Sequence, residues 1–163
     1  MGCGTGTLLA KIVREGGNQR LTGLDVSPAM LATAREKLGR TAGWVAGDAV
    51  RLPFRSASFD LALSLSALHH WPQPVEALHE IRRVLRPGGR VAITAWCGDT
   101  WVMRARDRAR RLVDPTHVRV HRTAELTELL AAAGYGWIRV ERWRLSWSWE
   151  IMTGVAATPS AGR

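Results

Sequence analysis

The sequence predicts an α/β fold with a mostly parallel sheet and helices on both of its faces. Residues 7–96 alternate between helical and strand-like hydrophobic patterns, which is typical of β-α units that order parallel strands. A glycine-rich turn at residues 2–6 opens this series. Residues 137–150 resemble two strands with no helix between them, which favours a closing antiparallel hairpin. The chain of 163 residues, 46% of them hydrophobic, is long enough for one domain with a core.

Local signals set the bounds of the elements up to residue 96. A helix after the glycine turn ends at Gly16-Gly17, and a second helix begins at Pro28, where Ser27 offers an N-cap oxygen, and stops at Gly39. A third helix carries an apolar stripe and stops before the glycines at 88 and 89. The expected elements are helices at about 8–15, 28–38 and 75–85 and strands at 21–25, 44–46, 59–65 and 90–96.

The pattern changes after residue 96. An arginine-rich helix is expected at about 101–112, and a further helix, capped by Thr123, ends at Gly134. Strands are expected at 137–143 and 143–150. The domain is accordingly placed at residues 1–152, and residues 153–163 are expected to form a flexible tail.

Composition limits the class of protein. The two cysteines, Cys3 and Cys97, give neither a disulfide framework nor metal-ligand spacing, which fits a reducing cytoplasm, and we expect no metal site. No apolar run reaches the roughly 18 residues of a spanning helix, and no targeting leader precedes the glycine turn. We therefore expect a soluble, cytoplasmic protein without a membrane span.

Arginine supplies nearly all of the formal charge of +9. Seven arginines lie between Arg104 and Arg122, against two aspartates. A solvated helix face explains such a stretch, and the alternative is an anionic partner such as nucleic acid or a membrane surface. We expect no specific nucleic-acid partner.

The glycine turn and a later carboxylate together predict a nucleoside site. Gly2, Gly4 and Gly6 alternate along a turn that runs into a helix, so backbone there can touch a ligand. The apolar run of residues 21–24 ends in Asp25, where an acid at a strand end can accept hydrogen bonds from a ribose. A dinucleotide fingerprint would need glycine at position 7, and Thr7 stands there, which disfavours a pyrophosphate ligand.

At these residues the chain resembles the class I S-adenosylmethionine-dependent methyltransferases, whose fold is a Rossmann-like, doubly wound, mostly parallel sheet with a C-terminal antiparallel hairpin. Their first motif is an acid, one residue and then G-x-G-x-G, and here the match begins at Met1, after the position of the acid. The usual first, central strand of the sheet is therefore lacking. A misassigned start or a gene fragment is the expected explanation.

Three later segments resemble the type 11 branch of this family: Gly47-Asp48-Ala49, Leu52-Pro53-Phe54 with Phe59-Asp60, and Leu85-Arg86-Pro87-Gly88-Gly89. The resemblance implies that Asp25 holds the ribose hydroxyls, that Asp48 accepts from the adenine amino group and that Val26 and Met30 wall the adenine, Met30 being equally well explained as helix core. Asp60 is better explained as the start of a strand. The implied cofactor-binding residues are Gly2, Cys3, Gly4, Gly6, Asp25, Val26, Met30, Asp48, Ala49 and Ser64.

Two adjacent histidines are the candidate catalytic residues. His69 and His70 follow the strand that the resemblance places at the sulfonium, and an imidazole can take a proton or orient an acceptor. The alternative is that at least one of them packs or caps the next helix. Methyl transfer needs a base only when the nucleophile is a hydroxyl or an acidic carbon. His79 is expected to be structural, and His117 and His121 are weaker candidates for the acceptor side.

The resemblance implies transfer of a methyl group from S-adenosylmethionine to a small-molecule acceptor through a C, N or O nucleophile. The alternative functions are a non-catalytic remnant and a basic binding module. The tryptophans at 143, 147 and 149 share one face of the expected last strand with Leu145. We expect this face to be buried beneath helices. The alternative is that, with Trp71 and Trp101, it lines a pocket for a hydrophobic acceptor.

Overall fold

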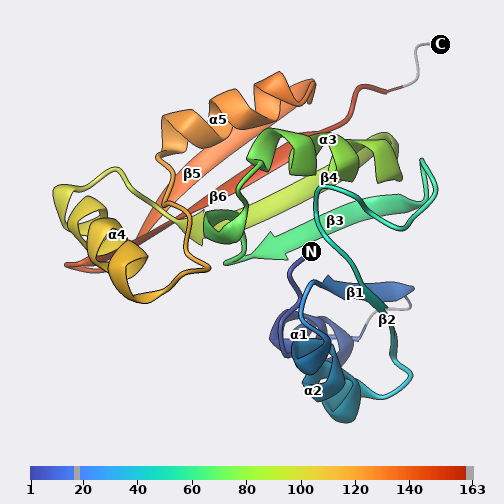
Figure 1. The fold of residues 1–163 in the computed structure, drawn as a ribbon. Coiled ribbons are helices and arrows are strands. Elements are labelled where there is room, and N and C mark those ends of the chain that lie inside the picture. The colour runs from blue at the N-terminus through green and yellow to red at the C-terminus, as the bar shows by residue number, and fades with distance from the viewer. Residues whose placement is uncertain (17–18, 161–163) are drawn as a thin grey trace.

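The computed structural model describes residues 1–16 and 19–160 (Figure 1). Its helices are α1 (Thr7–Arg14), α2 (Pro28–Leu38), α3 (Pro74–Val84), α4 (Trp101–Val113) and α5 (Thr123–Ala132), with a 3-10 turn η1 (Leu68–His70). Its strands are β1 (Leu21–Asp25), β2 (Ala42–Ala46), β3 (Phe59–Leu65), β4 (Leu85–Trp96), β5 (Trp137–Ser146) and β6 (Trp149–Ala157). The order of helices and strands predicted from the sequence is confirmed.

The strands form two hydrogen-bonded groups. In the first, β1 pairs with β2 in parallel, with Leu21 opposite Ala42 and Asp25 opposite Ala46. The second has the order β3-β4-β6-β5, in which β3 and β4 are parallel and β6 runs antiparallel to both β4 and β5. Parallel pairs joined by helices and closed by an antiparallel hairpin are the predicted fold class, which is confirmed.

The first three residues lie between the two groups of strands. The Met1 amine donates a 2.8 Å hydrogen bond to the Leu63 carbonyl of β3, and the Cys3 N–H donates one of 2.9 Å to the Leu24 carbonyl of β1. Among the described residues, no strand pairs with both β1 and β3 (Figure 1). The expected strand upstream of Met1 stays a prediction.

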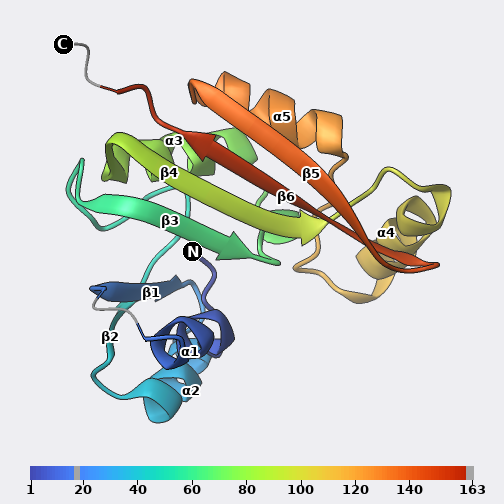
Figure 2. The same ribbon diagram turned by 180° about the vertical axis from the view of Figure 1, so that it is seen from behind.

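Helices α3 and α5 cover one face of the β3-β4-β6-β5 group (Figures 1 and 2). Ile93 of β4 and Met152 of β6 are fully buried on this face, as are Leu78 of α3 and Leu126 of α5. Gly154 lets α5 approach β6 closely, because a Cβ at that position would lie 2.9 Å from Leu126 Cδ2. The core is therefore a layer of helices packed on one layer of strands.

No helix of the described part of the chain crosses the opposite face of this group (Figure 2). Thr94 and Thr153 lie opposite each other in β4 and β6, where both are half-buried and their hydroxyls lie 3.1 Å apart. Leu61 and Leu65 of β3 are about half exposed. The expectation of helices on both faces is therefore not met for this group of strands.

The closing hairpin turns later in the chain than predicted. β5 continues to Ser146, Trp147 and Ser148 form the turn, and β6 begins at Trp149. The alternation of residues 143–150 predicts a single strand, but it spans both arms and the turn. This turn lacks the Gly, Asn or Asp that usually marks a two-residue connection. The alternating pattern therefore continues through it, and the sequence does not show where one strand ends and the next begins.

The flexible tail predicted at residues 153–163 is wrong for residues 153–158. Residues 153–157 are the second half of β6, which is hydrogen-bonded to β4 on one side and β5 on the other. Thr158 is buried and donates a 2.8 Å hydrogen bond to the Arg86 carbonyl. The small side chains of this segment suggest a loose tail. They also fit a strand that pairs on both sides and packs against α5. Residues 161–163 lie outside the described part.

Two helix ends also differ from the expectation. α1 ends at Arg14, and Gly17, expected in its terminating pair, lies outside the described residues. The N-cap of α5 is Arg122 and not Thr123, because the Glu125 carboxylate accepts the Arg122 N–H at 2.8 Å.

Within the residues described, no helix is long and apolar enough to cross a bilayer.

The tryptophans of the hairpin are exposed, so their predicted burial is wrong. Trp143, Trp147 and Trp149 are 51%, 85% and 38% exposed, and Leu145 is 65% exposed. α5 packs against the hairpin near Gly154, and the turn extends beyond the end of that helix (Figure 2). Distance from α5 therefore leaves the tip of the hairpin in solvent.

We expect Trp147→Ala to change the free energy of unfolding by no more than about 0.5 kcal/mol, because the side chain makes little contact with the core. The matched control is Trp71→Ala, since Trp71 is only 8% exposed. That variant should lose about 3 to 5 kcal/mol. Urea unfolding of both variants measures the difference, and a large loss in Trp147→Ala would contradict this placement of the hairpin tip.

Candidate functional site

The glycine turn is held by the carboxylate at the end of β1. Gly2, Gly4 and Gly6 all have positive φ angles, of 59°, 51° and 76°, which side chains rarely permit. The Gly4 N–H donates a 2.7 Å hydrogen bond to Asp25 Oδ2, and the Ser27 N–H donates one of 3.0 Å to Oδ1. One carboxylate thus joins the turn before α1 to the turn before α2.

The space around the turn differs from one glycine to the next. A Cβ on Gly2 would lie only 2.6 Å from Ala67 Cβ, so the turn packs directly against the residue before η1. A Cβ on Gly4 would meet no atom within 4 Å. The backbone at Gly4 therefore faces open space beside Asp25, as a ligand-binding turn requires.

The residues expected around an adenine lie after the ends of the parallel strands β1 and β2. Val26 and Met30 are 74% and 44% exposed, so Met30 is not a residue of the helix core. Asp48 is exposed, and its Oδ1 accepts the Val50 N–H at 3.2 Å, so the carboxylate already orders its own turn. Ala49 beside it is half-buried. Parallel strands bring these positions to the same edge of the sheet.

Ser64 and Cys3 complete the expected cofactor-binding set. The Ser64 hydroxyl near the end of β3 is buried and has no hydrogen-bond partner among the described atoms. Leaving a buried hydroxyl without a partner is energetically unfavourable. Cys3 packs beneath the turn, since its Sγ lies 3.1 Å from where a Cβ on Gly23 would stand. Burial raises the pKa of its thiol.

The two histidines of η1 have different surroundings. His69 is buried, and its ring stacks on Trp96 with centroids 4.5 Å apart and planes at 7°. His70 is exposed, and its Nδ1 lies 2.8 Å from the Thr116 carbonyl. Because a carbonyl only accepts, Nδ1 of His70 carries a proton, and in the neutral form of the ring Nε2 is the acceptor nitrogen.

Burial is the main reason that His69 stays neutral. Together with the nearby His70, His117 and Arg110, it lowers the pKa of His69 to about 4. Nδ1 of His69 is buried without a partner in the described part of the structure. A neutral imidazole in this position can orient a ligand but is a weak base.

A buried His–Asp pair lies next to η1, and the sequence-based prediction missed its acid. His117 Nε2 is 2.8 Å from Asp107 Oδ1, and the same oxygen accepts the Val120 N–H at 2.7 Å. Burial works against ionisation of Asp107, but hydrogen bonds from His117, the Val120 N–H and Arg111 hold its pKa below the usual range. The one feature of the sequence that points to this residue is that Asp107 is the only acid among the arginines of residues 101–113.

A cavity of about 530 Å³ lies beside this pair. It is bounded by α4, by the last residue of β4, by the first residue of β6 and by the loop that carries His117. Its aromatic and apolar walls include Trp96, Met103, Val113 and Trp149, and Arg106 and Arg110 add the charge. Its size and mostly apolar lining are those of a site for a small organic molecule.

Of the other candidates for the acceptor side, some line this cavity and some lie elsewhere. Trp71 is a core residue and Trp101 is 74% exposed on α4, and neither lines the cavity. His117 does line it, whereas His121 is buried at the parallel bridge with Cys97. Of the tryptophan face, only Trp149 contributes to the cavity wall.

Comparison with known proteins identifies the family. Residues 1–93 match a family model described as a methyltransferase domain. This chain belongs to that methyltransferase family. The family predicted from the sequence is confirmed, and with it the enzyme class and S-adenosylmethionine as the family's cofactor. The match ends within β4, so α4, α5 and the closing hairpin lie outside it.

Curated relatives resemble the first part of this methyltransferase domain. A ubiquinone/menaquinone biosynthesis C-methyltransferase of Ruegeria sp. is 35% identical over 95 residues, which are 55% of this chain and 38% of the relative. The O-methyltransferase resE of Aspergillus sclerotiorum is 40% identical over 104 residues, 61% of this chain and 39% of that protein. The chain thus spans less than half the length of these relatives.

The fold is shared over nearly the whole chain. The YcgJ protein from Bacillus subtilis superposes with a TM-score of 0.83 at 19% identity, covering 98% of this chain and 90% of that one. At this level of identity the likeness concerns the fold. It includes α4 and the hairpin, where the family model does not match.

Acid should destabilise the methyltransferase domain partly through His69. The lowered pKa of His69 means that the unfolded chain binds more protons than the folded chain between about pH 6.5 and 4, so stability falls as the pH falls through this window. From pH 7 to 5 this residue should account for about 2 kcal/mol of the loss. His69→Phe keeps an aromatic ring against Trp96 and should remove this contribution to the loss of stability between pH 7 and 5. Urea unfolding of both proteins at pH 7 and pH 5 measures this. If His69 were charged in the folded protein, the original chain and His69→Phe would show the same pH dependence of stability.

Proposed function

We propose that this methyltransferase domain binds S-adenosylmethionine at the glycine turn and transfers its methyl group to a small, largely apolar acceptor. The observation that carries the proposal is the arrangement around Asp25, whose carboxylate holds the Gly4 N–H at 2.7 Å beside open space. The family supports the reaction class. The cavity between α4 and the ends of β4 and β6 supports the acceptor class.

The residues present fit the cofactor. A carboxylate oxygen has more than one lone pair, so Asp25 can accept from ribose hydroxyls while keeping its two backbone donors. Exposed Val26 and Met30 offer apolar contacts to an adenine, with Asp48 and Ala49 beside its amino edge. The Ser64 hydroxyl without a partner and the backbone of Gly2, Cys3, Gly4 and Gly6 would meet the methionyl part.

When bound, S-adenosylmethionine supplies an electrophilic methyl group, so the protein's task is mainly to hold a nucleophile in line at roughly 3 to 3.5 Å from it. Because Gly2 packs against Ala67, the residue before η1, the glycine turn lies next to η1 in space. His70, with Nε2 as its acceptor nitrogen, would take a proton from a hydroxyl or acidic carbon. Buried, neutral His69 would orient the acceptor instead.

The acceptor is proposed to be a planar, apolar molecule. Trp96 and Trp149 form an edge-to-face pair, with centroids 5.6 Å apart, in the cavity wall. Relatives named for ubiquinone/menaquinone biosynthesis and for a methylphytylhydroquinone support an aromatic acceptor. A nucleic-acid acceptor is not favoured, because a flipped base needs polar groups along its edge and this lining is largely apolar.

We expect Asp25→Ala to weaken binding of S-adenosylhomocysteine to the 163-residue chain by roughly 2 to 4 kcal/mol, because charge-assisted hydrogen bonds to the ribose are lost. Isothermal titration calorimetry measures it. Asp60→Ala is the matched control, since Asp60 is an exposed acid of β3 that pairs with Arg86. The proposal for Asp25 fails if both variants bind like the original chain.

We expect the inosine counterpart of S-adenosylhomocysteine to bind more weakly by roughly 1.5 to 3 kcal/mol, because it lacks the amino group that donates to Asp48. In Asp48→Ala the two ligands should bind alike. Titration of both ligands into both proteins separates this role from turn-ordering alone, which would weaken the two ligands equally.

A further inference from the structure

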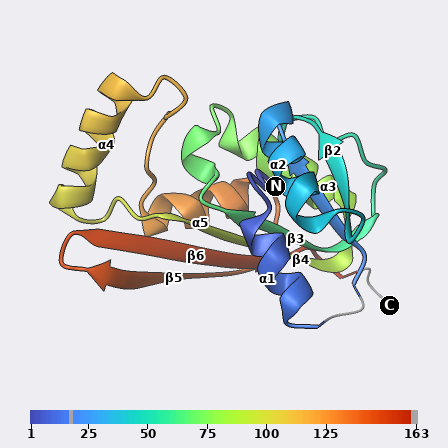
Figure 3. The same cartoon turned by 90° about the horizontal axis from the view of Figure 1, so that it is seen from below.

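One end of the molecule presents an unusual number of exposed apolar side chains. This α4–hairpin end comprises residues 101–113 and 143–149, which lie at the same end of the molecule in all three ribbon views (Figures 1, 2 and 3). Leu112, Trp147, Val113, Trp101 and Leu145 are 87%, 85%, 78%, 74% and 65% exposed. A concentration of large exposed apolar groups marks an interaction surface.

The two parts of this end are joined by direct contacts. Arg106 of α4 donates a 3.2 Å hydrogen bond to the Ser148 hydroxyl in the hairpin turn, and its guanidinium lies 4.3 Å from the Trp149 ring centroid. On α4, Trp101, Arg108 and Leu112 follow one another at spacings of seven and four residues, which places them on one face. All three are exposed, so α4 is amphipathic with part of its apolar surface turned outward.

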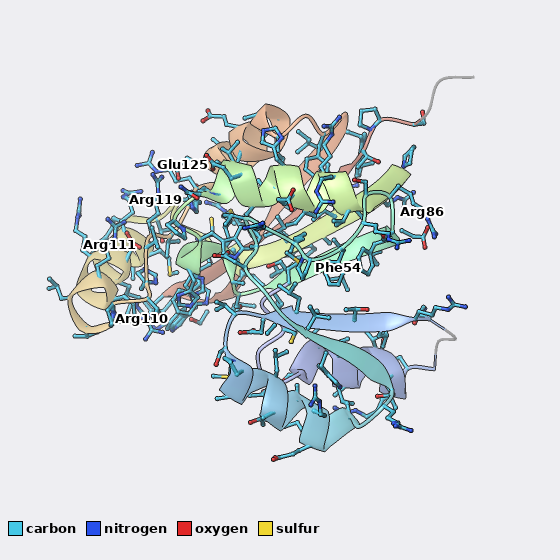
Figure 4. The ribbon with its side chains drawn as sticks, turned by 45° about the vertical axis from the view of Figure 1, so that its right-hand side comes forward. Phe54, Arg86, Arg110, Arg111, Arg119 and Glu125 are labelled. Carbon is cyan, nitrogen blue, oxygen red and sulfur yellow. The ribbon has the colours of Figure 1, made fainter. Side chains whose placement is uncertain are left out.

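The outward charge of this end is positive. Arg108 is exposed and has no ion-pair partner among the described residues, and Arg110 and Arg111 lie on the same helix (Figure 4). Two of the acids nearby are paired: Asp107 is buried and paired with Arg111, and Glu150 is buried and bonded to Arg144 at 3.2 Å. The third, Asp114 at the C-cap of α4, accepts hydrogen bonds from Thr116, so arginines still outnumber the acids at this end. The surface therefore combines unpaired cations with tryptophan and leucine side chains.

We propose that the α4–hairpin end docks on the surface of an anionic phospholipid bilayer. Arginines attract the head groups, and tryptophan and leucine side chains insert at the boundary of the acyl region, the combination by which interfacial helices bind membranes. Nucleic acid fits this surface less well, because a phosphate backbone offers no apolar surface against which Leu112 and Val113 can pack. This inference goes beyond the proposed function and does not depend on methyl transfer.

The position of the cavity gives the docking a consequence. Arg106, Arg110, Val113 and Trp149 belong to the α4–hairpin end and also line the cavity. Docking through this end therefore brings the cavity next to the bilayer. An apolar acceptor dissolved in the membrane would reach the cavity without crossing water.

The test is co-sedimentation of the 163-residue chain with phosphatidylcholine vesicles, with and without phosphatidylglycerol. The chain should bind the anionic vesicles and bind the neutral ones much less. Trp147→Ala should lower the partition coefficient at least roughly tenfold, and Arg108→Gln roughly fivefold. Brominated acyl chains should quench tryptophan fluorescence in the original chain and less in Trp147→Ala.

Two controls are matched to these variants. Trp137→Ala removes a tryptophan that is 53% exposed at the other end of β5, and Arg35→Gln removes an exposed arginine of α2, and neither should change binding. Circular dichroism checks that each variant is folded. Absent binding, equal binding to neutral vesicles, or equal loss in Trp147→Ala and Trp137→Ala would overturn the proposal. So would a dimer, seen by sedimentation velocity, that dissociates in Trp147→Ala while vesicle binding stays unchanged.

Discussion

The arrangement of the glycine turn and of the turn before α2 depends on the Asp25 carboxylate. It ends β1 and accepts hydrogen bonds from the Gly4 N–H in the turn before α1 and from the Ser27 N–H in the turn before α2. One side chain therefore links both turns to the end of β1. Because a carboxylate bonded to two backbone donors still has free lone pairs, the group that orders the turns can also receive a ligand.

The parts predicted correctly from the sequence are those decided within a few residues. Ser27 and Pro28 begin α2 and Gly39 ends it, as their local chemistry requires. The meeting of the glycine turn with Asp25 was also predictable, because parallel strands joined by helices bring successive strand ends to one edge. The structure adds the particular bonds, which no spacing rule specifies.

The parts predicted wrongly or missed depend on contacts between distant residues. Trp147 belongs to an apolar face by its spacing, but only the position of α5 along the hairpin decides that it stays in solvent. Gly154 suggests a loose tail until Leu126 is seen to pack against it. The Asp107–His117 bond requires the loop after α4 to fold back on the helix, which the sequence between them does not indicate.

Contacts at the end of β4 connect the family-matched part of the chain to the rest. His69 lies within the matched residues and stacks on Trp96, which lies just beyond them and also forms a wall of the cavity. The His69 carbonyl accepts the Val118 N–H at 2.8 Å, and its ring lies 5.3 Å from that of His117. Trp96 and the loop of His117 therefore connect α4 and the hairpin to the candidate catalytic histidines, and through these contacts changes in α4 or the hairpin can reach His69.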